Sequence, residues 1–471
     1  MTQQQRADSW ISSNGVGEMI RPSFLLQLFE AFLASVCLVA AYSLRHGRFD
    51  SEALFFDGGL FRLAAFVLVV ITVSYLFNLY DHRLFIDNRS SAIKVVSAMI
   101  VSLLVLAALF YILPGIGFWR GVLLISLLLF ALIQIMVRWM IRRFSRASMF
   151  ANKILIVGAG DLASEIASLV PRDDNMHSYV RFVACTEKDP LVDPAHIVGH
   201  ISDIKRIIQD YRPQKLIVAL SERRGNLPLK EIMHYKLQGV EVMEAPAYYE
   251  QIAGCLMLEQ IRPSSFIYNP RFRMTPFMRS YKRLVDIALS MFGLIVTVPF
   301  FPFIALAIRL DSKGPIFFKQ LRVGENEREF YVYKFRTMSD HAEKDTGAVW
   351  AQKNDPRVTK VGQFMRKTRI DEIPQLYNVL KGDMSFVGPR PERMTFVERL
   401  KESIPFYSTR HFVKPGVTGW AQVRYPYGAS DEDALEKLRY DLYYIKNYSI
   451  FLDFKIILDT IRVVTSGFGG R

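Results

Sequence analysis

The chain has 471 residues, 51% of them apolar, and a formal charge of +14 from 59 basic and 45 acidic side chains. Its length predicts about three domain-sized units, and its mean hydropathy of +0.16 indicates that part of it lies in lipid. The apolar content excludes an intrinsically disordered chain. Three widely spaced cysteines (Cys37, Cys185, Cys255) exclude a disulfide scaffold and a cysteine-built zinc site.

Residues 1–150 predict a membrane bundle of four helical spans. Each apolar run approaches the ~20 residues that a helix needs to cross hydrocarbon; the runs are 23–44, 59–80, 95–113 and 121–137. Lys and Arg gather in the N-terminal tail and after the second and fourth runs, which predicts that both ends of the bundle face the cytoplasm. Two charges fall inside runs, and we interpret Arg62 as snorkelling and Glu30 as facing a neighbouring helix.

Residues 151–275 predict a Rossmann-like α/β domain in the cytoplasm. A buried strand from Lys153 runs into Gly158-Ala-Gly160 and then into a helix, which is the turn that brings backbone N–H groups against a pyrophosphate. Further strands are predicted at 182–185, 216–220 and 240–243. The acid expected about 20 residues on is displaced to Glu187 or Asp189. We therefore favour a glycine turn kept for packing, with Gly158 and Gly160 as weak cofactor-binding candidates.

A fifth apolar run, 284–308, has basic residues at both ends. Both flanks therefore favour the cytoplasmic side, and Pro299 and Pro302 interrupt helical hydrogen bonding within the run. These facts predict a re-entrant membrane helix over about 282–309, which enters and leaves by the same leaflet. A straight fifth span is the alternative.

The densest polar motifs lie in residues 276–471, which we predict to be an α/β catalytic domain. Asp371 and Glu372 are adjacent carboxylates among basic residues, and Pro374 indicates that a helix begins just after them. Arginines clamp phosphate, and a hard divalent ion takes carboxylate and phosphate oxygens. Such parts carry out phosphoryl transfer. From this motif alone, a surface acidic pair with solvated neighbours is an equally good interpretation.

This region resembles the bacterial polyprenyl-phosphate glycosylphosphotransferases, which are membrane-embedded monotopic phosphoglycosyl transferases. The resemblance rests on five runs: Lys334-Phe-Arg336, Asp371-Glu372-Ile-Pro-Gln-Leu, Val387-Gly-Pro-Arg-Pro-Glu392, Lys414-Pro-Gly-Val-Thr-Gly-Trp-Ala-Gln422 and Tyr440-Asp441-Leu-Tyr-Tyr-Ile-Lys446. The four spans and the Rossmann-like domain resemble the long form of the family. Other stretches are most similar to its exopolysaccharide branch, which includes exosortase-associated members.

The resemblance implies a reaction that starts exopolysaccharide biosynthesis. A UDP-sugar and polyprenyl (undecaprenyl) phosphate would give polyprenyl-diphosphate-sugar and UMP. Asp371 would form a covalent phosphosugar ester, and Asp371 with Glu372 would hold Mg²⁺ or Mn²⁺. The residues implied to bind or help bind substrate phosphate are Arg366, Arg390, Lys334 and Arg336. Arg369 stands where many members have Ser, and this extra cation would lower the pKa of Asp371 and help to hold phosphate. Asp441, Asp453 and Arg322 are further candidates with only loosely defined roles.

The same resemblance implies a multi-pass protein of the bacterial inner membrane with its catalytic domain on the cytoplasmic side. The expected partners are a UDP-sugar, polyprenyl phosphate, membrane lipid, a second copy in a homodimer, and other polysaccharide-assembly proteins. Two alternatives stay open: a membrane-anchored NAD-dependent sugar-nucleotide oxidoreductase or epimerase, and a non-catalytic scaffold. Nucleic acid is not an expected partner, because the sequence shows no zinc knuckle, helix-turn-helix or basic-aromatic repeat.

The C-terminal segment 450–464 is predicted to be an amphipathic helix. Its apolar residues share one helical face. The pattern fits a helix lying on the membrane and a packing helix of the catalytic domain equally well.

Overall fold

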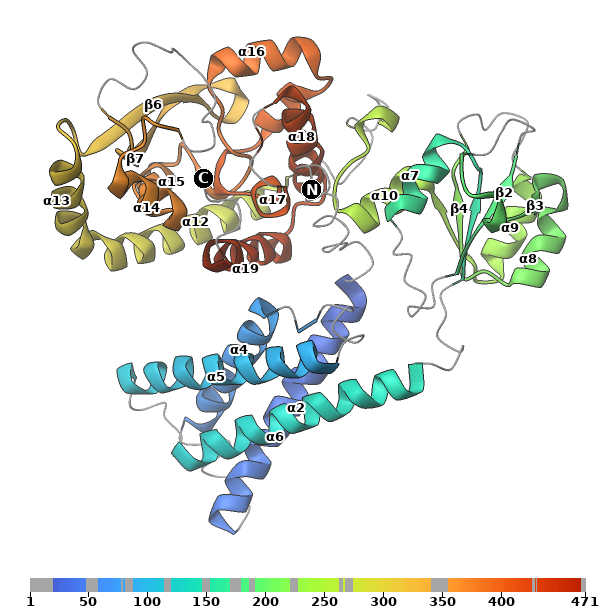
Figure 1. Cartoon of the computed structure of the whole chain (residues 1–471), viewed down its shortest axis with the longest axis horizontal. Helices are drawn as coiled ribbons and strands as arrows, with labels where there is room; N and C mark the ends of the chain where they lie inside the picture. The colour runs from blue at the N-terminus through green and yellow to red at the C-terminus, as the bar shows by residue number, and fades with distance from the viewer. Residues whose placement is uncertain are drawn as a thin grey trace. The chain divides into compact units, whose positions relative to one another are not determined.

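The computed structural model describes residues 20–47, 58–77, 79–80, 88–113, 120–145, 153–169, 179–185, 191–220, 228–261, 266, 274–339, 355–425, 428 and 430–466. Contacts divide the chain into two compact units (Figure 1). One is Val16–Tyr248, which holds a helical bundle and an α/β domain. The other is Tyr249–Arg471, grouped with Met1–Gly15.

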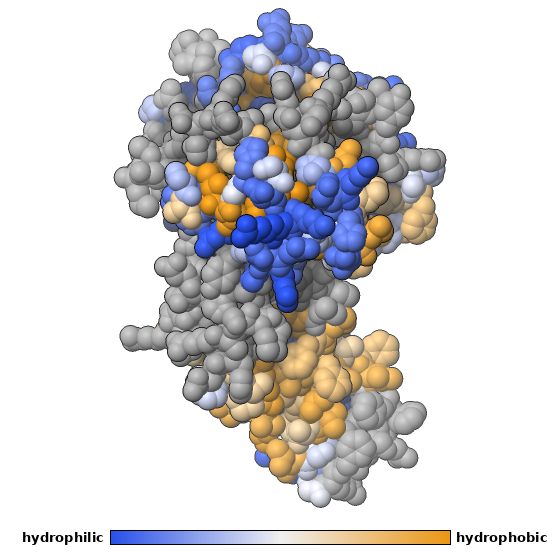
Figure 2. Space-filling view, turned by 90° about the vertical axis from the view of Figure 1, so that its right-hand side faces the viewer, coloured by the Kyte–Doolittle hydropathy of each residue, from blue (hydrophilic) through white to orange (hydrophobic). Residues whose placement is uncertain are grey.

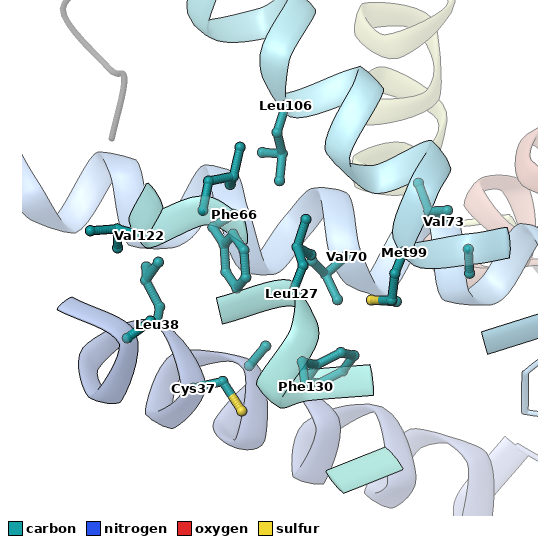
Figure 3. Close-up of a cluster of buried hydrophobic side chains, with 14 of the residues drawn as sticks. Cys37, Leu38, Phe66, Val70, Val73, Met99, Leu106, Val122, Leu127 and Phe130 are labelled. Carbon is teal, nitrogen blue, oxygen red and sulfur yellow. The ribbon is translucent and has the colours of Figure 1, made fainter. Parts of the chain in front are cut away.

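The bundle consists of long apolar helices: α2 (Ile20–His46), α4 (Gly59–Leu76), α5 (Asn88–Ile112) and α6 (Arg120–Ser145). Helix α2 packs against α4 and α6, and α5 packs against α4 and α6. Inward side chains such as Leu38, Phe66, Val70, Leu127 and Phe130 form a buried core between them (Figure 3). Helix α4 ends before the predicted Tyr80, because the chain turns after Leu76 and buries Leu79 and Tyr80 against the bundle.

The described residues on the visible face of the bundle are mostly apolar and appear orange in the space-filling view (Figure 2), and many large apolar side chains of these helices are exposed. Five helical segments among the described residues are long and apolar enough to cross a membrane, four of them in the bundle. The chain is therefore a membrane protein. Glu30 is buried in the bundle and lies 3.4 Å from Arg138 Nη2 of α6, so this carboxylate does face a neighbouring helix.

The α/β domain is a parallel five-stranded sheet with the order β3-β2-β1-β4-β5. Its strands are β1 (Lys153–Val157), β2 (Tyr179–Ala184), β3 (Ile197–His200), β4 (Lys215–Val218) and β5 (Glu241–Glu244). Helices α7 (Asp161–Leu169), α8 (Ile204–Tyr211) and α9 (Leu229–Leu237) connect them. The parallel α/β prediction is confirmed. Strand β3 was not predicted, because Gly199 and His200 interrupt its apolar residues.

The glycine turn after β1 is required by packing at its first glycine only. Gly158 has a φ of +131°, and a Cβ there would lie 2.4 Å from the backbone oxygen of Ala219, just after β4. Gly158 therefore lets the β1 turn approach β4 closely. A Cβ on Gly160 would have nothing within 4 Å. Glu187 and Asp189, the predicted ribose-binding candidates, lie outside the described residues.

This contrast predicts opposite outcomes for two matched substitutions. Gly158→Ala should destabilise the α/β domain by about 2 kcal/mol or more, because it forces both a strained φ and a backbone clash. Gly160→Ala should change stability by less than about 0.5 kcal/mol and keep substantial catalytic activity. Thermal unfolding and turnover of the two variants, at matched expression, would test this. Loss of turnover in Gly160→Ala alone would favour a bound nucleotide at the turn.

The C-terminal unit surrounds two small sheets with helices (Figure 1). Strands β6 (Phe317–Val323) and β7 (Glu329–Phe335) form an antiparallel hairpin, and β8 (Ser385–Val387) pairs in parallel with β9 (Gly416–Thr418). The helical elements are α12 (Pro276–Thr297), η8 (Val298–Phe300), α13 (Phe301–Asp311), α14 (Lys360–Thr368), η10 (Ile370–Glu372), α15 (Gln375–Lys381), α16 (Met394–Ser403), η11 (Tyr407–Phe412), α17 (Trp420–Arg424), α18 (Asp431–Lys446) and α19 (Ile450–Ser466).

The fifth apolar run is broken in its middle rather than continuous. Helix α12 begins at Thr275, whose hydroxyl accepts a hydrogen bond from Met278 N, and it gives way to η8 at Val298-Pro299. Helix α13 then leaves in a different direction (Figure 1). Many large apolar side chains of this segment are exposed: Phe292, Ile295, Val296, Val298, Phe300, Phe303, Leu306 and Leu310.

Polar contacts fasten the first half of α12 to the body of the C-terminal unit. Asp286 is buried and accepts hydrogen bonds from Ser385 Oγ (3.0 Å) and Phe386 N (2.8 Å) at β8. Arg283 donates to the Val379 and Leu380 carbonyl oxygens at 2.6 Å each, at the end of α15. Further along, a Cβ on Gly293 would lie 2.8 Å from Leu376 Cδ1, so the backbone of α12 rests directly on α15.

Helix α19 buries some of its apolar side chains and exposes others. Ile456, Leu458 and Val463 are buried against the unit, whereas Phe451, Phe454 and Ile461 are exposed. It is a packing helix whose outer face remains apolar.

Residues 249–261, which we call the strap, contact the C-terminal unit. The strap includes the end of α10 (Ala245–Ala253), and Glu250 Oε1 accepts a hydrogen bond from Asn447 at 2.7 Å. Trp420 Nε1 donates to the Gly254 carbonyl oxygen at 2.7 Å, and Leu256 N donates to that of Arg439 at 3.1 Å. These residues fall within the predicted range of the α/β domain, 151–275, and they make these contacts with α17, α18 and the residue that follows α18.

Candidate functional site

The Asp371–Glu372 pair lies in a short turn between two helices. Helix α14 stops at Arg369, whose backbone adopts the left-handed conformation with a φ of 61° and a ψ of 13°. The chain then forms the 3-10 turn η10, and Pro374 precedes α15. A left-handed non-glycine residue is uncommon and costs energy. This turn buries both carboxylates, each 7% exposed.

Glu372 is surrounded by cations from three separate elements. Its Oε1 lies 2.9 Å from Lys334 Nζ of β7 and 2.7 Å from Arg390 Nη2, in the loop after β8. Its Oε2 lies 3.8 Å from Arg369 Nη1. Burial alone would raise the pKa of Glu372, but the charges of Arg390 and Lys334 outweigh burial and hold this pKa well below its usual range. Glu372 is therefore a permanent carboxylate that organises the cations.

Asp371 has the opposite environment. Its Oδ1 is buried, and among the described residues this oxygen has no hydrogen-bond partner. Burial and the neighbouring charge of Glu372 raise the pKa of Asp371 to about 6, although Lys334 and Arg369 oppose the rise. A buried carboxylate with an uncommitted oxygen and a raised pKa is typical of a reactive group.

The other two predicted phosphate-binding residues have different surroundings. Arg366 of α14 donates from Nε to Thr337 Oγ1 at 2.9 Å, and its charge helps to lower the pKa of Asp371. Arg336 is buried, and it donates to the carbonyl oxygens of Ser312 (2.7 Å) and Lys313 (2.9 Å), just after α13. The structure thus brings Arg366 into the field of the pair and gives Arg336 contacts that hold the end of α13.

Asp441 and Asp453 form ion pairs elsewhere in the unit. Asp441 Oδ2 of α18 lies 2.8 Å from Arg410 Nη2, with both side chains buried. Asp453 of α19 lies 2.8 Å from Lys282 Nζ and accepts a hydrogen bond from Tyr444 at 2.7 Å, so it ties α19 to α12. In the part of the chain that the structure describes, neither contacts Asp371 or Glu372.

Arg322 joins the β6–β7 hairpin to the loop that carries Arg390. Its Nη1 donates to the Pro391 carbonyl oxygen at 3.1 Å and lies 3.5 Å from Glu392 Oε2.

Asn378 was not predicted as a site residue, yet it fastens α15 to β7. Its amide donates to the Tyr331 carbonyl oxygen at 2.7 Å and accepts from Tyr333 N at 3.1 Å. The sequence signal that could have identified Asn378 is its position as a polar residue among the apolar residues of α15.

Taken together, the arrangement is a cationic site with a reactive carboxylate at its centre. Two carboxylates lie in the field of Lys334, Arg366, Arg369 and Arg390, so an anionic ligand would balance the charge. Arginine guanidinium groups suit phosphate oxygens. The geometry therefore fits an anionic phosphate ester that reacts with Asp371.

Comparison with known proteins identifies the family of this unit. The family profile described as "Bacterial sugar transferase" matches residues 277–467. An exopolysaccharide production protein of Rhizobium leguminosarum bv. phaseoli is 44% identical over 185 residues, which is 38% of this chain and 92% of that protein. The chain belongs to the bacterial sugar transferase family.

Two other relatives are longer than this Rhizobium protein. A UDP-N-acetylgalactosamine-undecaprenyl-phosphate N-acetylgalactosaminephosphotransferase of Aeromonas hydrophila is 48% identical over 197 residues, 42% of this chain and 46% of its own length. An undecaprenyl-phosphate glucose phosphotransferase of Komagataeibacter xylinus is 33% identical over 319 residues, 66% of this chain and 59% of its own length. The alignments thus span about half the length of these two relatives. A second profile, described as a CoA-binding domain, matches residues 75–233 of the transferase.

Proposed function

We propose that this protein transfers a sugar-1-phosphate from a UDP-sugar to undecaprenyl phosphate, giving undecaprenyl-diphosphate-sugar and UMP, as the first step of exopolysaccharide synthesis. The observation that carries the proposal is the buried Asp371, which has an uncommitted oxygen beside a cation-bound Glu372. The names of the relatives from Aeromonas and Komagataeibacter, both undecaprenyl-phosphate phosphotransferases, support the same reaction.

The chemistry follows from the two carboxylates having different tasks. Asp371 as a carboxylate attacks the phosphorus that bears the sugar, and the bond from this phosphorus to the bridging oxygen breaks, so that UMP leaves. A phosphate oxygen of undecaprenyl phosphate then attacks the same phosphorus and releases Asp371. Lys334, Arg366, Arg369 and Arg390 stabilise the negative charge that spreads over the phosphate oxygens. Glu372 keeps these cations gathered in the empty enzyme.

The broken apolar segment supports action at a membrane surface. An exposed apolar α12–α13 segment that is broken at η8 and has basic residues at both ends suits re-entry into one leaflet. We propose that it seats the carboxylate pair where lipid phosphates meet cytosolic UDP-sugars, on the cytoplasmic side of the bacterial inner membrane. The homodimer and the recruitment of other polysaccharide-assembly proteins remain predictions.

A divalent cation fits the donor set in part. Among the described residues, no three His, Cys, Asp or Glu side chains lie close enough together to form a complete metal site. In the described part of the chain, Asp371 Oδ1 has no hydrogen-bond partner, and Glu372 Oε2 lies 3.8 Å from Arg369 Nη1. Mg²⁺ is commonly bound by one or two carboxylates together with substrate phosphates. We propose Asp371 and Glu372 as its ligands, where the ion would neutralise phosphate charge.

Removal of the divalent cation is therefore expected to stop turnover without unfolding the protein. EDTA should abolish UMP release, and added Mg²⁺ or Mn²⁺ should restore it. Because the ion would be bound largely through substrate, we expect EDTA to leave the thermal unfolding midpoint of the substrate-free protein unchanged. Undiminished turnover in EDTA would contradict the metal proposal and leave the role of Asp371 intact.

The pH dependence should follow the ionisation of Asp371. Since the attacking group is the carboxylate, kcat/KM should rise with pH through an apparent pKa near 6. Arg369 lowers this pKa, so Arg369→Gly should move the rise to higher pH while keeping the left-handed backbone at no cost. Arg369→Ala should move it equally, but without the gain of about 1 kcal/mol in stability that glycine brings at a left-handed position. An unchanged pH profile in both variants would contradict this assignment.

The direct test is UMP release from a panel of UDP-sugars, with undecaprenyl phosphate and the purified full-length protein in detergent or membranes. Release that requires both substrates supports the transferase. Turnover of NAD with a UDP-sugar, without UMP, would favour the oxidoreductase alternative. Absence of any reaction across the panel would favour the scaffold.

A further inference from the structure

Arg410 is a buried arginine whose contacts converge on the loop that carries Arg390. Its Nη1 donates to Tyr407 Oη at 2.7 Å, and its Nη2 donates to the Arg390 carbonyl oxygen at 3.0 Å. The same Nη2 lies 2.8 Å from Asp441 Oδ2 of α18, and the guanidinium covers the Tyr407 ring. The phosphate-binding motifs did not single out this residue, and the chemistry proposed above does not use it.

The loop 388–392 is fixed at four consecutive carbonyl groups. Gly416 N donates to the Pro389 oxygen at 2.9 Å, and Val323 N donates to the Glu392 oxygen at 2.9 Å. Between them, Arg410 holds the Arg390 oxygen and Arg322 holds the Pro391 oxygen. The outer two bonds come from backbone and the inner two from arginine side chains. Of these four bonds, the one from Arg410 is the bond to the residue that bears the Arg390 side chain.

The side chain of Arg390 makes the contact that matters for chemistry, because its Nη2 lies 2.7 Å from Glu372 Oε1. A continuous path thus runs from Asp441 through Arg410 to the backbone of Arg390, and from its guanidinium to Glu372. Asp441 and Arg410 are 2% and 6% exposed. A buried ion pair is weak evidence for stability, since desolvation offsets its attraction. The Asp441–Arg410 pair therefore has a better explained role in orienting the loop 388–392 than in stabilising the fold.

We propose that Arg410, held by Asp441, is the positioning residue that aims Arg390 at Glu372 and at the substrate phosphate. The proposal rests on the transferase function argued above, and it assigns a role to Asp441. Arg410 acts only through Arg390, so the two residues should be coupled in kinetics.

A double-mutant cycle tests this coupling. Arg410→Lys keeps the charge but cannot make all of these contacts, and we expect kcat/KM for UMP release to fall on the order of 10-fold. Arg390→Lys should cost at least as much. The kcat/KM of the double variant should be within about 2-fold of that of Arg390→Lys alone, because Arg410 then has no Arg390 guanidinium to position. Arg399→Lys is the matched control, an exposed arginine paired with Asp431, and should change nothing.

Three outcomes are distinguishable. Effects that multiply in the double variant, or an Arg410→Lys protein as active as Arg399→Lys, overturn the positioning role. If Arg410→Lys unfolds at the assay temperature, Tyr407→Phe replaces it in the cycle, since it removes only the hydroxyl that accepts from Arg410. A wild-type protein that releases no UMP contradicts the transferase function itself.

Discussion

Replacing Asp371 by Asn is expected to lower UMP release by about 10³-fold or more, because the amide cannot act as the attacking carboxylate. The substitution conserves size and removes one negative charge from a cation-rich site, so the fold should survive it. A UDP-sugar labelled with ³²P at the sugar-linked phosphorus should leave label on the wild-type protein when undecaprenyl phosphate is withheld. The Asn variant should retain none.

Asp431→Asn is the matched control for this experiment. Asp431 lies at the start of α18 and pairs with the exposed Arg399. It should keep wild-type labelling and turnover. Full activity in Asp371→Asn would end the covalent mechanism. Lost activity with retained label would instead mean that another residue accepts the phosphosugar.

Removing the strap is expected to have the second-largest effect, on stability rather than chemistry. A fragment that starts at residue 249 should fold in detergent, whereas one that starts at residue 262 should not unfold cooperatively. The strap buries Cys255, Leu256, Met257 and Leu258, each less than 10% exposed. Burial of side chains of this size contributes about 1.5–3 kcal/mol each, which together approaches the whole stability of a typical domain.

Single substitutions within the longer fragment separate the contributions. Trp420→Phe removes the indole N–H that donates to the Gly254 carbonyl oxygen, and should cost about 1 kcal/mol. Glu259→Gln weakens only a half-exposed ion pair with Arg439 and should cost less than about 0.5 kcal/mol. Thermal unfolding of the fragments and variants measures both. Equal midpoints for the two fragments would show that the strap contributes nothing.

The sequence predicted those features that a local pattern encodes. The lengths of the apolar runs identified the bundle helices, because a helix needs about 20 apolar residues to cross lipid, whichever helices it packs against. The run from Lys153 predicted β1 and its glycine turn for the same local reason. The end of α4 was harder, since the turn at Phe77 is stabilised by burial of Leu79 and Tyr80 rather than by a helix-stop signal.

The convergence on Glu372 could not be predicted from spacing. Lys334 is 38 residues and Arg390 is 18 residues distant in sequence, and they lie on different elements. Motif likeness grouped Arg336 with Lys334, and residues two apart on one strand share a face. However, β7 ends at Phe335, and Arg336 beyond it donates to the carbonyl oxygens of Ser312 and Lys313, just after α13. The sequence spacing does not reveal these distant partners.

The close seating of α12 on α15 has a consequence for how the bilayer acts on this enzyme. Gly293 has no side chain, so the backbone of α12 contacts Leu376 of α15 directly. Helix α15 begins shortly after the carboxylate pair. A hydrophobic segment adjusts to a thicker or thinner bilayer by tilting or kinking. With the membrane placement proposed above, such a tilt in α12 would change the distance between Asp371 and the lipid phosphates. Acyl-chain length, and not only headgroup charge, should therefore set the rate at which lipid phosphate meets the phosphosugar.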